Sequence, residues 1–258
     1  MTTRVRLATA LSFMAFGLSP ISARGADNAY DNAAATAYDS GWNNGTNGGG
    51  GFGAWILSNT GSGGRFIGNS AGNGSGSSGN INTSGEAFGM WANTGGVSEA
   101  IRSFNGTPLQ QGQSFYIRMD NGFIQAGGTV GLGLQNAAGA NRIEFFFVGG
   151  QSNYKVNNTV TSTDTGVGFT ADGLRLQFTI APTNQVRVIV RNNAGSSTLF
   201  DQLISVANNT DITRFRLFNA NAGSGGSHDA FFNEMAVPEP GSTALLLLIG
   251  AVGLRRRR

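Results

Sequence analysis

Apolar and polar residues alternate along much of the second half of the chain. In 113–120, Phe115, Ile117 and Met119 fall on one face of an extended chain, and the residues between them, mostly polar, fall on the other. Successive side chains of a strand point to opposite faces of a sheet, so this pattern predicts strands with one apolar face. The other segments expected to be strands are 86–92, 97–104, 130–134, 174–180, 186–191, 212–219 and 229–235.

Two further segments refine this prediction. Residues 143–148 are apolar on both faces, which is typical of a strand in the middle of a sheet. Ala181-Pro182-Thr183-Asn184 lies between two alternating runs and predicts a hairpin turn.

These patterns predict an all-β fold. About ten to thirteen antiparallel strands, each with one apolar face, indicate a two-sheet sandwich of the jelly-roll type. The layout is similar to the concanavalin-like sandwiches of lectins and glucanases, a likeness of fold that carries no activity. Helices are expected only in the two terminal segments, and the sandwich domain is expected to span 26–236.

The first part of that domain, 27–85, is rich in Gly, Asn and Ser. Sixteen glycines fall between Gly41 and Gly85. Apolar residues recur among them, so we expect short strands joined by tight turns. These apolar residues are Trp42, Phe52, Trp55, Ile56, Leu57, Phe66 and Ile67.

Residues 1–25 have the order of a secretory signal peptide. Arg4 and Arg6 precede the apolar run 7–18, and a segment of small residues follows it. The run is too short to span a bilayer, which needs about 20 residues. Cleavage is expected after Ala23, Gly25 or Ala26, and the alternative is a buried N-terminal helix.

Residues 237–258 contain three elements in a fixed order. Pro238-Glu239-Pro240 is followed by the apolar stretch 242–254 and then by Arg255, Arg256, Arg257 and Arg258. As a helix the apolar stretch is roughly 20 Å long, shorter than the hydrocarbon core of a bilayer. The terminal arginines would stay on the cytoplasmic side.

This tail resembles the PEP-CTERM sorting signal of exported bacterial proteins. The resemblance implies a Gram-negative-type host with a polysaccharide matrix, and transient insertion into the inner membrane. An exosortase would then remove the tail near Pro238-Glu239-Pro240 and leave the protein at the cell surface or outside the cell. The alternative is a plain C-terminal membrane anchor, with the tail retained.

The charge of the chain changes once the ends are set aside. The whole chain has a formal charge of +3, but residues 26–240 have ten basic and 14 acidic residues, a charge of −4. A nucleic-acid partner is therefore not expected, and a neutral glycan is favoured over a strongly acidic one. The chain has no cysteine, which excludes disulfides and thiolate chemistry.

The sequence indicates no catalytic residue. His228 is the only histidine, and we expect it in a surface loop rather than in a Ser-His-Asp site. Glycosidases need two facing carboxylates, whereas Glu86, Glu99, Glu144 and Glu234 are scattered over different segments.

A cofactor is not expected, with one weak exception. Asp229 and Asn233 near the end of the domain are candidates to meet Asp27 or Asp31 near its start and hold a structural Ca²⁺, which prefers oxygen ligands. The alternative is that all four are solvated polar side chains.

Aromatic residues among Asn and Gly are the candidates for stacking on sugars. Trp42, with Gly41 before it and Asn43 after it, is the best exposed candidate, and Trp91 and Tyr116 are the others. Trp55 lies beside Ile56 and Leu57 and is expected in the core.

Three functions are consistent with this sequence. The leading hypothesis is a non-enzymatic protein of the extracellular polysaccharide matrix. The alternative is a lectin-like carbohydrate-binding module, and a polysaccharide hydrolase is a distant third.

Overall fold

The computed structural model describes residues 27–73, 80–105 and 108–239 of the chain. The expected signal peptide and the sorting tail beyond Glu239 lie outside the described residues. Within the described ranges, no helix has the length and hydropathy needed to cross a membrane. The helices there are three short 3-10 turns: η1 (Thr36–Tyr38), η2 (Ser70–Gly72) and η3 (Gly226–His228).

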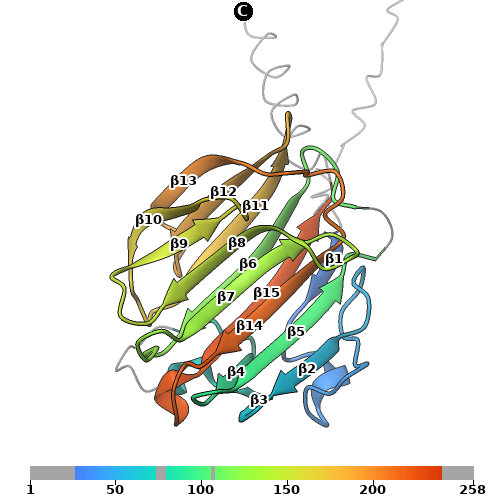
Figure 1. The fold of residues 1–258 in the computed structure, drawn as a ribbon. Coiled ribbons are helices and arrows are strands. Elements are labelled where there is room, and N and C mark those ends of the chain that lie inside the picture. The colour runs from blue at the N-terminus through green and yellow to red at the C-terminus, as the bar shows by residue number, and fades with distance from the viewer. Residues whose placement is uncertain (1–26, 74–79, 106–107, 240–258) are drawn as a thin grey trace, which may run out of the picture.

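Two antiparallel sheets form a sandwich, with the smaller sheet in front in Figure 1. The larger sheet has eight strands. In spatial order these are β13 (Thr198–Ser205), β12 (Gln185–Asn192), β11 (Leu174–Ala181), β6 (Ser114–Asn121), β15 (Ala230–Pro238), β4 (Ala87–Ala92) and β3 (Gly63–Gly68), with β1 (Asp27–Asp31) paired to the end of β15.

The smaller sheet has seven strands. In spatial order these are β10 (Ser162–Gly168), β9 (Asn153–Asn157), β8 (Asn141–Val148), β7 (Thr129–Gln135), β14 (Arg214–Ala220), β5 (Val97–Ser103) and β2 (Ile56–Thr60). The predicted all-β, two-sheet antiparallel sandwich is therefore confirmed.

The apolar faces of the alternating strands meet between the sheets. Phe115 of β6 stacks on Phe215 of β14, with ring centroids 4.8 Å apart, and joins the two layers. Both rings are fully buried, as are Leu132 and Phe178 on neighbouring strands. This continuous core is the reason that each strand keeps one apolar face.

The local predictions hold where the alternation is strong. Residues 143–148 belong to β8, which lies inside the smaller sheet between β7 and β9. The expected hairpin turn joins β11 to β12, and Ala181 pairs with Gln185 across it. Thr183 and Asn184 close the turn with φ angles of 63° and 55°.

Three strands, β9, β10 and β13, were not expected from the sequence. β10 and β13 are edge strands of the two sheets, and most of their side chains are exposed. A strand that buries few side chains needs little apolar alternation, so the pattern that reveals the inner strands is weak in these two.

The Gly-rich segment 27–85 forms β1, β2 and β3, with loops that pack onto the core between them. At Gly49, with φ +64°, an added Cβ would meet the carbonyl oxygen of Tyr30 at 1.9 Å, so this close approach requires glycine. At the other end, β15 runs two residues past the expected boundary at 236, because Val237 is buried in the core.

Candidate functional site

The outer face of the larger sheet is divided into a covered half and an open half. Phe66, Ile81, Ala87 and Phe231 form a small second apolar cluster over β3, β4 and the start of β15. The segment that carries Ile81 therefore closes this half. The rest of the face, on β6, β11, β12 and β13, carries mostly polar side chains, with Tyr116, the buried Ile189 and the exposed Leu203 among them.

Three arginines lie side by side on this open half. Strand pairing places Arg118 of β6 opposite Arg175 of β11, and Arg175 opposite Arg191 of β12. Directly opposite residues have their Cβ atoms about 4.5–5.5 Å apart, so the three guanidinium groups share one region of the surface. We call Arg118, Arg175 and Arg191 the arginine row.

Two tyrosines lie in the adjacent row. Tyr30 of β1 pairs with Ala236 of β15, Ala236 pairs with Tyr116 of β6, and Tyr116 pairs with Gln177 of β11. Tyr30 is 41% exposed and Tyr116 is half-buried. Ala236, which has a small side chain, lies between the two tyrosines in this row. We call Tyr30, Ala236, Tyr116 and Gln177 the tyrosine row.

Two hollows follow these rows along β11 and β12. The first, about 290 Å³, is lined by Tyr116, Gln177, Arg175 and Arg191. The second, about 900 Å³, begins at Thr179 of β11 and extends to the β11–β12 turn and to β13. Gln177 and Thr179, successive outward residues of β11, line one hollow each, so the two hollows follow one another along this strand. We call the two hollows together the groove.

Carboxylates balance only part of the positive charge on this face. Arg118 forms an ion pair with Glu234 at 2.8 Å. Arg187, which lies opposite Thr179, forms an ion pair with Asp201 at 2.7 Å. Over the described ranges, neither Arg175 nor Arg191 forms an ion pair. Arg175 donates from Nε to the carbonyl oxygen of Asn193 at 2.5 Å. Arg191 donates from Nη1 to Oε1 of Gln177 at 3.3 Å.

The pKa of Arg118 is lowered chiefly by burial and to a lesser extent by the neighbouring Arg175. The negative charge of Glu234 opposes the shift. The arginine row is therefore a site where an added negative charge would be favourable.

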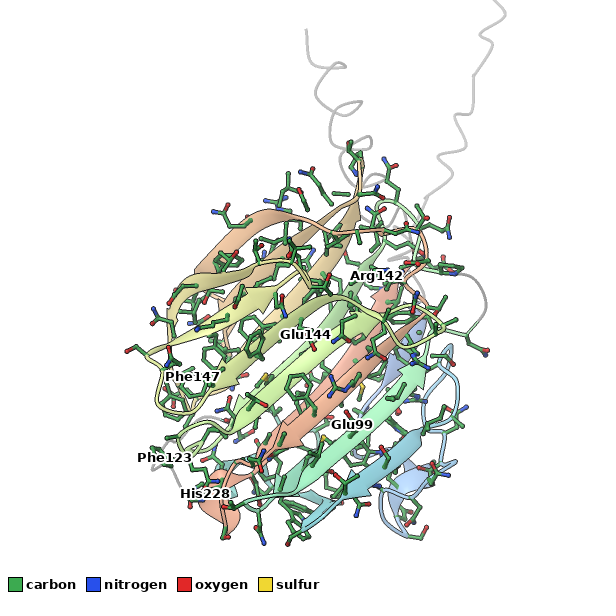
Figure 2. The ribbon with its side chains drawn as sticks, viewed as in Figure 1. Glu99, Phe123, Arg142, Glu144, Phe147 and His228 are labelled. Atoms are coloured by element: carbon green, nitrogen blue, oxygen red, sulfur yellow. The ribbon has the colours of Figure 1, made fainter. Side chains whose placement is uncertain are left out.

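On the outer face of the smaller sheet, two arginines have acidic partners. Arg216 of β14 lies between Glu99 of β5 and Glu144 of β8 and pairs with both, at 2.5 and 3.5 Å. Arg142 pairs with Asp211 at 2.5 Å. Figure 2 shows Glu99, Arg142 and Glu144 on the sheet facing the viewer. Arg214 of β14, on the same face, forms no ion pair among the residues that the structure describes and donates from Nε to Oε1 of Gln135 at 3.1 Å.

The structure thus brings two of the scattered glutamates to one guanidinium. Burial raises the pKa of Glu144, whereas the charge of Arg216 and a hydrogen bond from Asn157 lower it. Arg216 occupies the space between the carboxylates of Glu99 and Glu144, which is where a glycosidase would hold its substrate.

The single histidine lies at the end of the sandwich opposite the hairpin turn. His228 ends η3, its Nδ1 lies 3.0 Å from Oγ of Ser227, and its ring contacts the exposed Phe123 edge-on. Figure 2 shows His228 and Phe123 together at the lower edge of the molecule. Nearby, burial raises the pKa values of Asp120 and Asp229 to about 7.

The expectation that Trp42 is an exposed stacking residue is wrong. Trp42 is 4% exposed and packs against Trp55 and Phe88, with ring centroids 5.1 and 4.9 Å away. Its glycine and asparagine neighbours form the turns that fold the loop inward. Trp55 is buried, as predicted.

The other two candidates lie on the same face of the larger sheet but in different places. Trp91 is half-buried over Gly64, on the side that the second apolar cluster covers. Tyr116 lies in the groove, beside the arginine row. Only Tyr116, of the three predicted residues, is positioned to contact a ligand there.

The expected calcium ligands do not come together. Oδ1 of Asn233 accepts a hydrogen bond from the backbone N–H of Ala33, and its Nδ2 donates to the carbonyl oxygens of Ile81 and Glu86. Asp31 pairs with Arg102 in the core. Over the described part of the chain, no three His, Cys, Asp or Glu side chains are grouped to hold a metal ion.

Sequence reasoning missed the arginine row. Arg118, Arg175 and Arg191 each occupy an outward position of an alternating strand, which the pattern does show. Which outward residues become neighbours depends on the pairing of β6 with β11 and of β11 with β12, and alternation within one strand carries no information about that.

No protein-family model matches the chain, and no curated protein matches it. Among solved structures, the chain is similar to a carbohydrate esterase from the Shiga toxin-encoding bacteriophage phi24B, with 15% identity, a TM-score of 0.46, and coverage of 71% of this chain and 88% of that one.

Two lectin structures are also similar. A galectin from Caenorhabditis elegans has 8% identity and a TM-score of 0.39, with 53% of this chain and 89% of that one covered. A legume lectin-like domain from Entamoeba histolytica has 12% identity and a TM-score of 0.42, with 60% and 84% covered. All three TM-scores are below 0.5, so these likenesses carry nothing about function.

Proposed function

We propose that this chain is an exported, non-catalytic carbohydrate-binding protein of an extracellular polysaccharide matrix, and that it binds glycan in the groove on the larger sheet. The observation that carries the proposal is the tyrosine row. Tyr30 and Tyr116 flank the small Ala236 on an open face, and the side chain of Gln177 lies next to Tyr116.

Aromatic faces suit the apolar faces of sugar rings, and neighbouring amides supply the hydrogen bonds that orient them. The groove is open rather than enclosed, so it suits a segment within a long polymer. Export and sorting through the tail remain expectations from residues 1–25 and 237–258, and they agree with a partner outside the cell.

The smaller sheet supports the non-catalytic part of the proposal. Its two neighbouring carboxylates, Glu99 and Glu144, are both engaged by Arg216. A hydrolase would need one carboxyl group free to donate a proton and another free to act as base or nucleophile.

The test is affinity electrophoresis of the full-length chain through gels that contain single polysaccharides, with titration calorimetry on any that retard it. We expect Kd values between ~1 μM and ~1 mM. Tyr116→Ala should weaken binding about tenfold, because a stacking ring is lost. Phe123→Ala is the matched control, since Phe123 is an exposed aromatic at the other end of the sandwich.

Two results would contradict the proposal. One is that no polysaccharide in a broad panel retards the protein, which would leave a structural role in the matrix. The other is that Tyr116→Ala and Phe123→Ala weaken binding equally, which would place the site elsewhere.

A further inference from the structure

We propose that the groove selects acidic polysaccharides, and that the arginine row binds the carboxylates of uronic acid residues. This inference rests on the proposed function and names its ligand class. It reverses, for this surface, the expectation of a neutral glycan that the charge of −4 on residues 26–240 favours.

The first argument is the arrangement of like charges. Arg175 lies opposite Arg118 on one side and opposite Arg191 on the other. Like charges that are directly opposite in a sheet destabilise it. Glu234 pairs with Arg118, and Asp201, which pairs with Arg187, also interacts electrostatically with Arg191. The surplus of positive charge therefore lies at the centre of the row, at Arg175.

The second argument is the contrast with the other sheet. There Arg216 pairs with Glu99 and Glu144, and Arg142 pairs with Asp211. A third outward arginine there, Arg214, forms no ion pair over the described ranges, but its cross-strand neighbours are Ser103 and Gln135, so no like charge lies opposite it. On the open half of the larger sheet, Arg175 and Arg191 lie opposite one another and line a hollow.

The third argument is the shape of the groups involved. A guanidinium presents paired N–H donors in a plane, and these match the two oxygens of a carboxylate. The nitrogens that Arg175 and Arg191 commit to hydrogen bonds here are Nε and Nη1, respectively. Each therefore keeps further donors for a ligand in the hollow.

The fourth argument is the spacing of the two rows. Arg118 and Tyr116 are two residues apart on β6, which is about 7 Å along a strand. This is of the order of one sugar unit. A uronic acid ring lying on Tyr116 would therefore direct its carboxylate to the arginine row, so that both rows contact the same polymer.

The experiment compares each polyuronate with its own neutral form. Alginate, polygalacturonate and polyglucuronate are used before and after chemical reduction of their carboxyl groups to alcohols, with the full-length chain. We expect at least one polyuronate to bind ten or more times tighter than its reduced form. Its binding should weaken as salt rises, because added ions screen exposed charges.

Variants locate the effect. Arg175→Gln and Arg191→Gln should each weaken polyuronate binding about tenfold and leave binding to the reduced polymer unchanged. Arg142→Gln, on the other sheet, should change neither. Thermal unfolding of Arg191→Gln should not fall below that of the wild type, because removing one of three like charges relieves repulsion.

The outcomes separate this inference from the proposed function. Equal binding of the native and reduced polymers would overturn the inference and leave the proposed function standing. Binding of neither form of any polyuronate would overturn the inference, and the broad panel of polysaccharides would then decide the proposed function separately. If dextran sulfate bound more tightly than every polyuronate, the groove would attract polyanions in general rather than recognise carboxylates, and the inference would be overturned. A parallel loss of binding and stability in Arg191→Gln would show that the row is structural.

Discussion

Asp31 and Arg102 form an ion pair that is fully buried, with both side chains at 0% exposure. Arg102 also donates to the carbonyl oxygens of Gly53 and Gly48, at 2.6 and 2.9 Å, and lies 5.0 Å from the ring of Trp55. Asp31 accepts a further hydrogen bond from the hydroxyl of Tyr38. The pair therefore fastens the Gly-rich first part of the domain to β5.

Asp31→Asn should lower the free energy of unfolding by about 3–5 kcal/mol, because it leaves the charge of Arg102 buried without a counterion. Urea unfolding measures the change. Asp201→Asn is the control, since its ion pair with Arg187 is largely exposed and should contribute no more than about 1 kcal/mol. Similar decreases in the free energy of unfolding for the two variants would show that the buried ion pair is not the main interaction holding the Gly-rich first part of the domain to β5.

Trp42→Ala should also destabilise the protein, by about 3–5 kcal/mol, because it removes a large side chain from the core and leaves a cavity. Val160→Ala, at a position 84% exposed, should change stability by about 0.5 kcal/mol or less. Thermal and urea unfolding of both variants give the comparison. If Trp42→Ala weakened glycan binding at unchanged stability, Trp42 would be a surface residue after all.

Stability should fall as the pH rises through neutrality. Burial raises the pKa of Asp120 from 3.8 to about 7, and hydrogen bonds from Ser70 and Asn73 oppose the rise. The folded protein therefore keeps this proton to a higher pH than the unfolded chain does. The stability that the proton contributes is fully present below about pH 4 and is lost as the pH rises through about 7.

Asp120→Asn tests whether the loss of stability comes from Asp120, because the amide of asparagine does not titrate. The free energy of unfolding of the wild type should decrease between about pH 5 and about pH 8, and that of Asp120→Asn should decrease less. Asp164→Asn is the control: Asp164 is exposed and its pKa is lowered, chiefly by the backbone N–H of Gly166, so it is ionised in both states over this range. Parallel pH profiles for wild type and Asp120→Asn would assign the loss to another group.

Processing of the tail is a separate prediction. Protein recovered from the surface or medium of its native host should lack residues 244–258, because an exosortase is expected to remove the tail near Pro238-Glu239-Pro240. Intact-mass measurement decides this. A mass that includes Arg255, Arg256, Arg257 and Arg258 would indicate a retained anchor. In that case a variant without residues 238–240 should differ from the wild type only by the mass of those three residues.

The inward and outward faces of most strands could be predicted from the sequence alone. Phe115, Ile117 and Met119 are buried because alternation with a period of two is a property of a single strand, and a short stretch of chain contains it completely. The hairpin turn at 181–184 could be predicted for the same reason, since its residues are consecutive. The edge strands β10 and β13 could not, because they bury too few side chains to need the pattern.

Only the tertiary structure decided which outward residues became neighbours. Arg118, Arg175 and Arg191 form a row because β11 pairs with β6 and β12 in one register, and a shift of one residue would turn Arg175 to the other face. Trp42 is buried because its loop folds onto the core through contacts with Trp55 and Phe88, although its sequence neighbours are small and polar. Strand alternation is a local property of the chain, whereas a binding surface is made by residues that are distant in sequence and adjacent only once the sheets have paired.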